Sequence, residues 1–278
     1  MSRDIQRAGN LEVFASRLNY YQSTKSTFIV RSSGLSRKIC FANSNKVWRF
    51  FGGSHHSYVD GSYFTQLVRK QIDSYIDKYG IVPTFDKPDI QLFNVPAIKS
   101  NLKKPVVAVD INACHWTTAY HLGFISQELF ERGLQSGKKK GLLVAIGALN
   151  KLEQVDYYEG GVLVKTEYDL ENFNRYSPFY WAVIQRVRDT MMRAYEHFED
   201  DLYMWLTDCV FTNFDSRAKA QQFLSELGYN SKFYYTDFVK IDPVRVYWYE
   251  PKKQTVKYVG YKGRDITSTY PLWKISNY

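Results

Sequence analysis

The stretch from Ala108 to Trp116, which reads Ala-Val-Asp-Ile-Asn-Ala-Cys-His-Trp, is the part of the sequence on which the interpretation of the fold depends. A short apolar run from Val106 to Val109 leads to the carboxylate of Asp110. Such a run predicts a buried strand, and Asp is favoured where a chain leaves regular structure. Two roles for Asp110 stay open at this point: the end of a strand, or a metal ligand at the edge of a sheet.

A second acid in a similar setting makes Asp110 more informative. Asp208 lies within the segment Met204 to Phe211, MWLTDCVF, and has apolar residues on both sides. A buried carboxylate is unfavourable unless it has hydrogen bonds or a cation. Two strands that each present one Asp can hold Mg²⁺, and such ions stabilise the attacking and leaving oxygens in nucleotidyl transfer. Either acid alone is more often structural, but the pair indicates a metal site.

The rest of the chain predicts an α+β protein with a mainly antiparallel sheet. Aromatic residues make up 17% of the 278 residues, and Tyr and Phe favour strands. Alternating patterns around turn residues predict hairpins at 155–168, with a Glu-Gly-Gly turn, and at 244–263. Apolar residues at helical spacing predict helices at 63–78 and at 177–198, the second with Ser177 as N-cap and Pro178 in its first turn. Shorter patterns predict helices at 117–133 and 216–228, strands at 26–31 and 55–59, and a basic loop at 136–141.

Charge and cysteine content narrow the classes of function. The net charge is +9 and the pI is about 9.2, which favours a polyanionic partner because Lys and Arg neutralise phosphates, although charge alone does not decide this. Three cysteines without paired spacing indicate neither a disulfide framework nor a zinc site. The N-terminus has no apolar core typical of a signal peptide, and no apolar run reaches membrane-spanning length. We therefore expect a cytoplasmic protein of a reducing compartment with no membrane segment.

The segment DINACHW at 110–116 resembles motif A of family B DNA polymerases and is most similar to the protein-primed type. Asp110 matches the metal-binding Asp of that motif and Asn112 also matches, whereas Ala113, His115 and Trp116 replace its Ser, Tyr and Pro. Two further segments resemble the next motifs in the same order. In the motif B-like segment 139–151, Lys139 matches the triphosphate-binding Lys and Gly147 the Gly, while three apolar residues replace the polar ones: Leu143, Val144 and Ile146. In the motif C-like segment 203–211, Thr207 and Asp208 match, whereas Leu206 replaces the first Asp and Cys209 the Ser.

The resemblance implies a polymerase palm-like antiparallel sheet flanked by helices, with minimal fingers and thumb elements. Residues 1–45 would be a polar N-terminal segment and residues 46–278 the palm-like domain, with a possible reduced thumb at about 230–278. The implied function is a minimal metal-dependent nucleotidyltransferase that extends a nucleic-acid primer. Asp110 and Asp208 would bind Mg²⁺ or Mn²⁺, Lys139 the triphosphate, and Asn112 and His115 the nucleotide.

The alternative is a polymerase-derived palm that no longer catalyses, because motif B has lost its polar groups and motif C its first acid. Such a protein would be a nucleic-acid-binding or assembly subunit of a viral or mobile-element complex, in the host cytoplasm. DNA, primed or single-stranded, would be the partner in both cases. The candidate nucleic-acid-binding residues are basic, and Arg188 matches the Arg of the family's Pro-led helix: Lys138, Lys140, Arg188, Lys252, Lys253 and Lys257.

Overall fold

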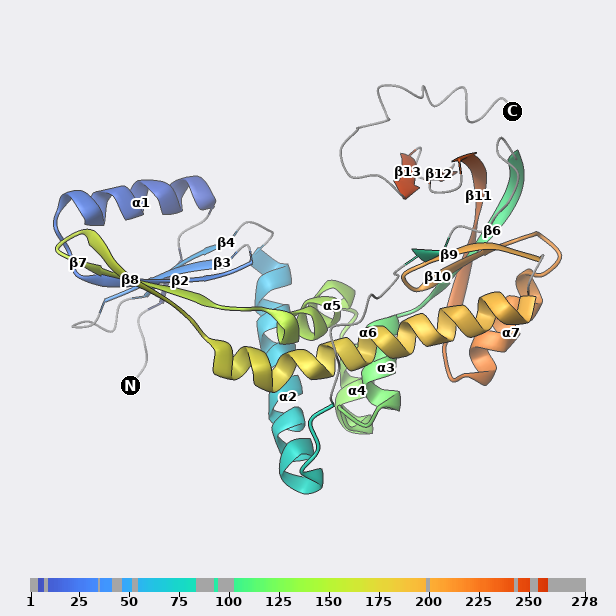
Figure 1. Cartoon of the computed structure of the whole chain (residues 1–278), viewed down its shortest axis with the longest axis horizontal. Helices are drawn as coiled ribbons and strands as arrows, with labels where there is room; N and C mark the ends of the chain where they lie inside the picture. The colour runs from blue at the N-terminus through green and yellow to red at the C-terminus, as the bar shows by residue number, and fades with distance from the viewer. Residues whose placement is uncertain are drawn as a thin grey trace. The chain divides into compact units, whose positions relative to one another are not determined.

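Two β-sheets and their flanking helices form this computed structural model (Figure 1). The structure describes residues 5–7, 10–34, 36–41, 47–51, 55–83, 93–94, 103–198, 201–242, 245–250 and 255–259. Its side-chain positions are described for residues 10–34, 36–41, 47–50, 61–83, 106–198 and 201–236. The chain divides into two units, of which the first contains residues 1–87 and 119–183 and the second residues 88–118 and 184–278. The predicted boundary between residues 45 and 46 stays a prediction.

The first unit contains a six-stranded sheet in the order β1-β4-β3-β2-β7-β8. All neighbouring strands are antiparallel except β1 and β4, which are parallel. The strands are β1 (Ile5–Arg7), β2 (Phe28–Ser33), β3 (Ser36–Cys40), β4 (Val47–Phe51), β7 (Gln154–Glu159) and β8 (Val162–Tyr168). Helix α1 (Leu11–Ser23) covers one face of this sheet (Figure 1), where Phe14 and Leu18 pack against a cluster that includes Phe28, Val30 and Phe50.

The other helices of the first unit surround α2 (His55–Tyr79). They are α4 (Gln127–Gln135), α5 (Lys139–Gly147), the short 3₁₀ helix η1 (Ala148–Asn150) and the first part of α6 (Leu170–Phe198), up to residue 183. Helices α2 and α5 pack closely at Gly61, where an added Cβ would lie 2.4 Å from Val144 Cγ1. Glycine at this position therefore allows the two helices to approach one another.

The second unit contains a seven-stranded sheet in the order β13-β12-β11-β6-β10-β9-β5, and every pair of neighbours is antiparallel. The strands are β5 (Phe93–Asn94), β6 (Lys103–Ile111), β9 (Leu202–Leu206), β10 (Cys209–Thr212), β11 (Ser231–Asp242), β12 (Arg245–Glu250) and β13 (Thr255–Val259). Helix α3 (Cys114–His121) follows β6, and α7 (Arg217–Glu226) follows β10.

The two faces of β6 have different surroundings. Val107, Val109 and Ile111 pack against the C-terminal part of α6 and against α7, which lie along one side of the sheet (Figure 1). Val106 and Ala108 belong to a second cluster with Met204, Phe211 and others on the opposite face. Because side chains alternate along a strand, Asp110 lies on the same face as Val106 and Ala108. The sheet face of Asp110 is therefore the one opposite α6 and α7.

The fold confirms the predicted α+β class with antiparallel sheets flanked by helices, which is compatible with a palm-like core. Both predicted hairpins are present, as β7–β8 and β12–β13. The fingers and thumb assignments stay predictions. No helix in the described ranges is long and apolar enough to span a membrane.

Several local predictions were wrong. Residues 55–59 begin α2 instead of forming a strand, and residues 139–141 are helical instead of part of a loop. The single helix predicted at 117–133 is instead two helices, α3 and α4, with an interruption at Gly123, whose φ is +73°. Helix α6 begins before the predicted N-cap, since the carboxylate of Asp169 accepts a hydrogen bond from the backbone N–H of Asn172 at 3.2 Å. Pro178 therefore lies inside the helix, where its missing N–H removes one helical hydrogen bond.

Candidate active site

The pairing of β6 with the β9–β10 hairpin brings Asp110 and Asp208 to the same end of adjacent strands. Asp110 is next to the last residue of β6, and Asp208 lies in the two-residue turn between β9 and β10. Cys209, which follows Asp208, is the direct partner of Asp110 in the sheet. The backbone N–H of Ile111 donates to the carbonyl oxygen of Asp208 at 3.0 Å. The proximity of the two acids results from the pairing of strands that are about 100 residues apart in the chain.

Backbone conformations that are unfavourable for L-amino acids flank both acids. Among the described residues, three non-glycine residues have positive φ, and two of them are Ala113, at +47°, and Thr207, at +52°. Ala113 follows β6 three residues after Asp110, and Thr207 precedes Asp208 in the turn. Such residues carry a conformational cost of about 1–3 kcal/mol and are concentrated at functional sites. Their positions support a functional interpretation of the acid pair.

The two carboxylates affect the same two buried thiols, those of Cys114 and Cys209. Burial is the main cause that raises the pKa of Cys209 well above its usual value, and the negative charges of Asp110 and Asp208 raise it further. Burial also raises the pKa of Cys114, with additional contributions from Asp208 and Asp110. Because both acids act on both thiols, they share one electrostatic environment. The buried thiols remain protonated at neutral pH, so neither can act as a thiolate nucleophile.

Strand β11 supplies a functional candidate that the sequence reasoning missed, Lys232. Lys232 is the direct partner of Asp110 on the other side of β6, and its ammonium group forms an ion pair with the Asp110 carboxylate. The Lys232 Nζ also lies 3.5 Å from the amide oxygen of Asn112. No local pattern distinguishes this lysine in the sequence, because its position beside Asp110 depends on the pairing of strands far apart in the chain.

The oxygen atoms around Lys232 provide a test of whether the site suits a metal ion. In the ranges with described side chains, no group of three or more His, Cys, Asp or Glu residues could hold a metal. Two carboxylates and the amide oxygen of Asn112 are nevertheless hard ligands of the kind that Mg²⁺ prefers. The ammonium group of Lys232 is paired with Asp110 and lies 3.5 Å from the amide oxygen of Asn112. Leu206, which stands where motif C has its first Asp, contributes no ligand.

The remaining predicted nucleotide-binding residues lie in different surroundings. His115 is in α3, and burial lowers the pKa of its imidazole, so the ring is neutral at pH 7. Asn112 is exposed directly after β6. Lys139 is the exposed first residue of α5 in the first unit, whereas Asp110 and Asp208 belong to the second unit.

The predicted nucleic-acid-binding residues are described only in part. Lys138 and Lys140 are exposed at the start of α5, and Arg188 is in α6 with its guanidinium 3.5 Å from the carboxylate of Asp189. Lys252 and Lys253 lie outside the described residues. Lys257 is in β13, and its side chain is also outside the described set.

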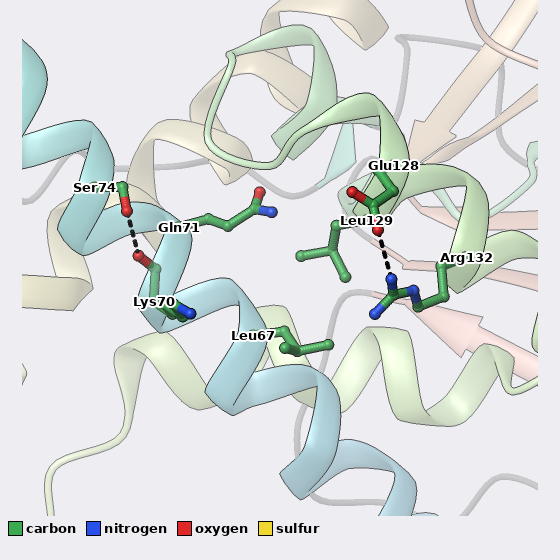
Figure 2. Close-up of a pocket in the computed structure, with 7 residues that line it drawn as sticks. All are labelled: Leu67, Lys70, Gln71, Ser74, Glu128, Leu129 and Arg132. Atoms are coloured by element: carbon green, nitrogen blue, oxygen red, sulfur yellow. Dashed lines mark hydrogen bonds and ion pairs between the residues drawn. The ribbon is translucent and has the colours of Figure 1, made fainter.

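A separate pocket of about 270 Å³ lies between α2 and α4 in the first unit (Figure 2). Leu67 and Leu129 provide apolar walls, and the guanidinium of Arg132 in this pocket is already paired with the carboxylate of Glu128 at 2.6 Å. The pocket contains neither acid of the pair and no predicted site residue. We therefore assign it no part in the candidate active site.

The similarity of this chain to known proteins is weak. No protein-family model matches this chain, and no curated protein is detectably similar in sequence. Among solved structures, the family B DNA polymerase from the hyperthermophilic archaeon Pyrobaculum calidifontis is similar, with a TM-score of 0.39 and 11% sequence identity. The match covers 74% of this chain and 34% of that polymerase, so the chain spans about a third of its length. This is a weak structural similarity, and it does not establish membership of the family.

Proposed function

We propose that this protein is a metal-dependent nucleotidyltransferase that extends a nucleic-acid primer. The observation that supports this proposal is that Asp110, near the end of β6, lies beside the β9–β10 turn that contains Asp208. The exposed amide of Asn112 and the ammonium group of Lys232 lie at the same end of these strands. Nucleotidyl transfer needs mainly positioning and neutralisation of negative charge, so few protein groups are required besides a metal ion and a cation. Asp110, Asp208 and Asn112 offer oxygen ligands for a metal ion. Lys232 offers the cation.

The proposed roles follow from the chemistry of each side chain. Asp110 and Asp208 would hold Mg²⁺ or Mn²⁺, which supplies charge neutralisation for the transferred phosphoryl group. Lys232 would then release Asp110 and be available to pair with a substrate phosphate. His115, being neutral, would contact the nucleotide through van der Waals contact or a hydrogen bond but not through charge. The role of Lys139 at the triphosphate is implied by the motif resemblance.

A primer-extension assay with labelled nucleotides and Mg²⁺ or Mn²⁺ tests the proposal. We expect wild-type protein to incorporate nucleotides, and Asp208→Asn and Asp110→Asn each to reduce the rate by more than about 100-fold, because even groups that only orient metal ligands contribute 10–100-fold. Asp215→Asn, at an exposed acid outside the pair, is the matched control and should retain activity. Absence of incorporation by folded wild-type protein on all primed DNA and RNA templates would overturn the proposal.

One observation favours the second candidate function, a nucleic-acid-binding or assembly subunit without catalysis. The ion pair of Lys232 with Asp110 places a fixed positive charge beside the carboxylate where a metal ion would bind. In that case Lys138, Lys140 and Arg188 would contribute to nucleic-acid binding through phosphates. Binding would fall steeply with salt concentration because counterions are released. Salt-dependent binding that is unaffected by Asp208→Asn, together with no incorporation, would support this candidate over the enzyme.

A further inference from the structure

The face of the seven-stranded sheet opposite Asp110 carries exposed aromatic rings. Phe233 and Tyr235 of β11 are the sheet partners of Val109 and Val107, whose side chains face α6 and α7. Lys232 and its neighbour Tyr234 pair instead with Asp110 and Ala108 on the other face. Because side chains alternate along β11, Phe233 and Tyr235 are on the helix side of the sheet, on the face opposite Asp110.

Three rings and one guanidinium form a contiguous group, which we call the aromatic platform: Phe214, Arg217, Phe233 and Tyr235. The three rings are 56%, 40% and 47% exposed for Phe214, Phe233 and Tyr235. The rings of Phe214 and Tyr235 are stacked, with centroids 5.5 Å apart and an interplanar angle of 11°. Phe233 meets Tyr235 edge to face at 5.7 Å. Exposed aromatic side chains that contact one another mark an interaction site more often than scattered single residues do.

Arg217 joins the platform as its cationic member. Its guanidinium carbon lies 4.4 Å from the centroid of the Phe233 ring, and its Nη1 donates a hydrogen bond to the Tyr235 hydroxyl at 3.1 Å. The planar groups are therefore already ordered by contacts with each other. A ligand that stacks on them would lose less free energy to side-chain ordering than one that binds mobile rings.

A separate hydrogen-bond network fixes the segment that presents Phe214. The carboxylate of Asp201 accepts hydrogen bonds at 2.6 Å from both the Ser216 hydroxyl and the Asn213 side-chain amide. The side-chain oxygen of Asn213 accepts in turn from the backbone N–H of Ser216 at 2.8 Å. The hydroxyl of Ser216 is the main cause that lowers the pKa of Asp201, so the network holds the ionised carboxylate. A tightly bonded turn thus holds a large apolar ring in solvent.

We propose that the aromatic platform binds single-stranded nucleic acid by stacking on its bases. Flat rings with exposed surfaces accept any base, and stacking of this kind is tolerant of sequence. The charge in the segment 213–220 is complementary to phosphate, since Arg217 and Lys219 outnumber Asp215, and the chain as a whole carries +9. A protein partner would also contact exposed rings, but the combination of stacked planes with a local and global positive charge favours a nucleic acid.

The platform extends the proposed function without depending on catalysis. It lies on the other face of the sheet from Asp110, so it would bind a strand, or a part of a strand, that is not at the acid pair. Asp208→Asn should therefore abolish incorporation and leave platform binding unchanged. Loss of nucleotide incorporation and loss of binding at the aromatic platform are therefore measured separately.

Binding of a fluorescent twelve-nucleotide oligothymidylate, measured by anisotropy, tests the proposal against an abasic oligonucleotide of equal length. We expect Phe214→Leu and Tyr235→Leu, which keep apolar bulk but remove the ring, each to weaken oligothymidylate binding about 5- to 100-fold. Binding of the abasic strand should change little, because it offers phosphates without bases. Tyr235→Phe keeps the ring and should retain most of the affinity. Tyr168→Leu is the matched control, since Tyr168 is 53% exposed on β8 of the other unit.

The outcomes separate the possible occupants. Affinity that stays within twofold of wild type in both leucine variants, or that falls equally for the abasic strand, would overturn the proposal. Wild-type protein provides a check that needs no folded variant: photocrosslinking with a 5-iodouracil oligonucleotide should label peptides containing Phe214, Phe233 or Tyr235. Crosslinks that map only elsewhere would also refute base stacking at the platform, and would leave the rings as a surface for a protein.

Discussion

Replacing Lys232 with Gln is expected to tighten the binding of Mg²⁺ or Mn²⁺ to the acid pair. The ammonium group of Lys232 pairs with the Asp110 carboxylate and lies 3.5 Å from the Asn112 amide oxygen, so it competes with a metal ion for the same oxygens. The glutamine side chain is one bond shorter and carries no charge. Metal binding to the variant therefore no longer requires the ion pair to be broken.

The size of the effect follows from the exposure of the pair. The side chains of Lys232 and Asp110 are 47% and 21% exposed, so water screens their interaction. Exposed ion pairs contribute about 0.2–1 kcal/mol. At RT of about 0.59 kcal/mol, loss of that competition lowers the Kd of the metal by about 1.4- to 5-fold. The same estimate limits the loss in the free energy of unfolding to about 1 kcal/mol, so the variant should remain folded.

Calorimetric titration of Mn²⁺ into wild type and variants measures this effect directly. Lys38→Gln is the matched control, because Lys38 also forms an ion pair, with Glu153 at 3.9 Å, but in the other unit. Lys38→Gln should leave the Kd unchanged, and Asp110→Asn should weaken binding by more than tenfold, since it removes a charged ligand. Weaker metal binding by Lys232→Gln than by wild type would refute the competition. No metal binding by either protein would favour the non-catalytic candidate.

Other predictions concern stability and reactivity. Gly161→Ala should lower the free energy of unfolding by about 2–4 kcal/mol in urea denaturation, since φ is +81° and an added Cβ would lie 2.2 Å from the Gln22 carbonyl oxygen. The control Gly160→Ala, at φ +56° in open space, should lower it by only about 1 kcal/mol, and equal effects would contradict the packing argument. Burial lowers the pKa of His115 from 6.5, so its contribution to stability is complete above pH 6.5 and is lost as the pH falls through the folded-state pKa. His115→Gln should therefore flatten the dependence of Tm on pH in that range. An unchanged slope would show that His115 does not cause this dependence. The buried thiols of Cys114 and Cys209 should resist Ellman's reagent in the native protein while the partly exposed Cys40 reacts, because burial raises their pKa and blocks access. Rapid reaction of all three cysteines would show that the site around Asp110 and Asp208 is open to solvent.

The local features that the sequence predicted well are those encoded by neighbouring residues. Alternating aromatic and polar residues around Gly160 and Gly161 predicted the β7–β8 hairpin, because both glycines adopt the positive φ that the tight turn requires. The helix at 216–228 was predicted in the same way, and α7 spans Arg217–Glu226. Periodicity also predicted the interior of α2 correctly but not its beginning, since Gly-Gly before residue 55 is compatible with either a turn or a helix start.

Errors occurred where a local signal had two structural meanings. Ser177 and Pro178 have the form of a helix start, but Asp169 provides the first N-terminal hydrogen bond and the helix continues through the proline. Tertiary packing of the flanking residues compensates for the one backbone bond that Pro178 removes. Phe179 and Val183, both fully buried, show that this part of α6 is held by its neighbours.

The sequence by itself determined that a buried strand leads to Asp110 and that Asp208 lies between apolar segments, because hydrophobic patterns report burial. It also determined the basic charge and the abundance of aromatic residues. Only the tertiary structure decided that β6 pairs with β10 on one side and with β11 on the other, and hence that Asp208 and Lys232 both lie beside Asp110. The same pairing places Phe233 and Tyr235 on the opposite face. The physical reason is that a strand's hydrogen-bonding groups are alike along its length, so its partner and register are selected by packing between residues distant in the chain.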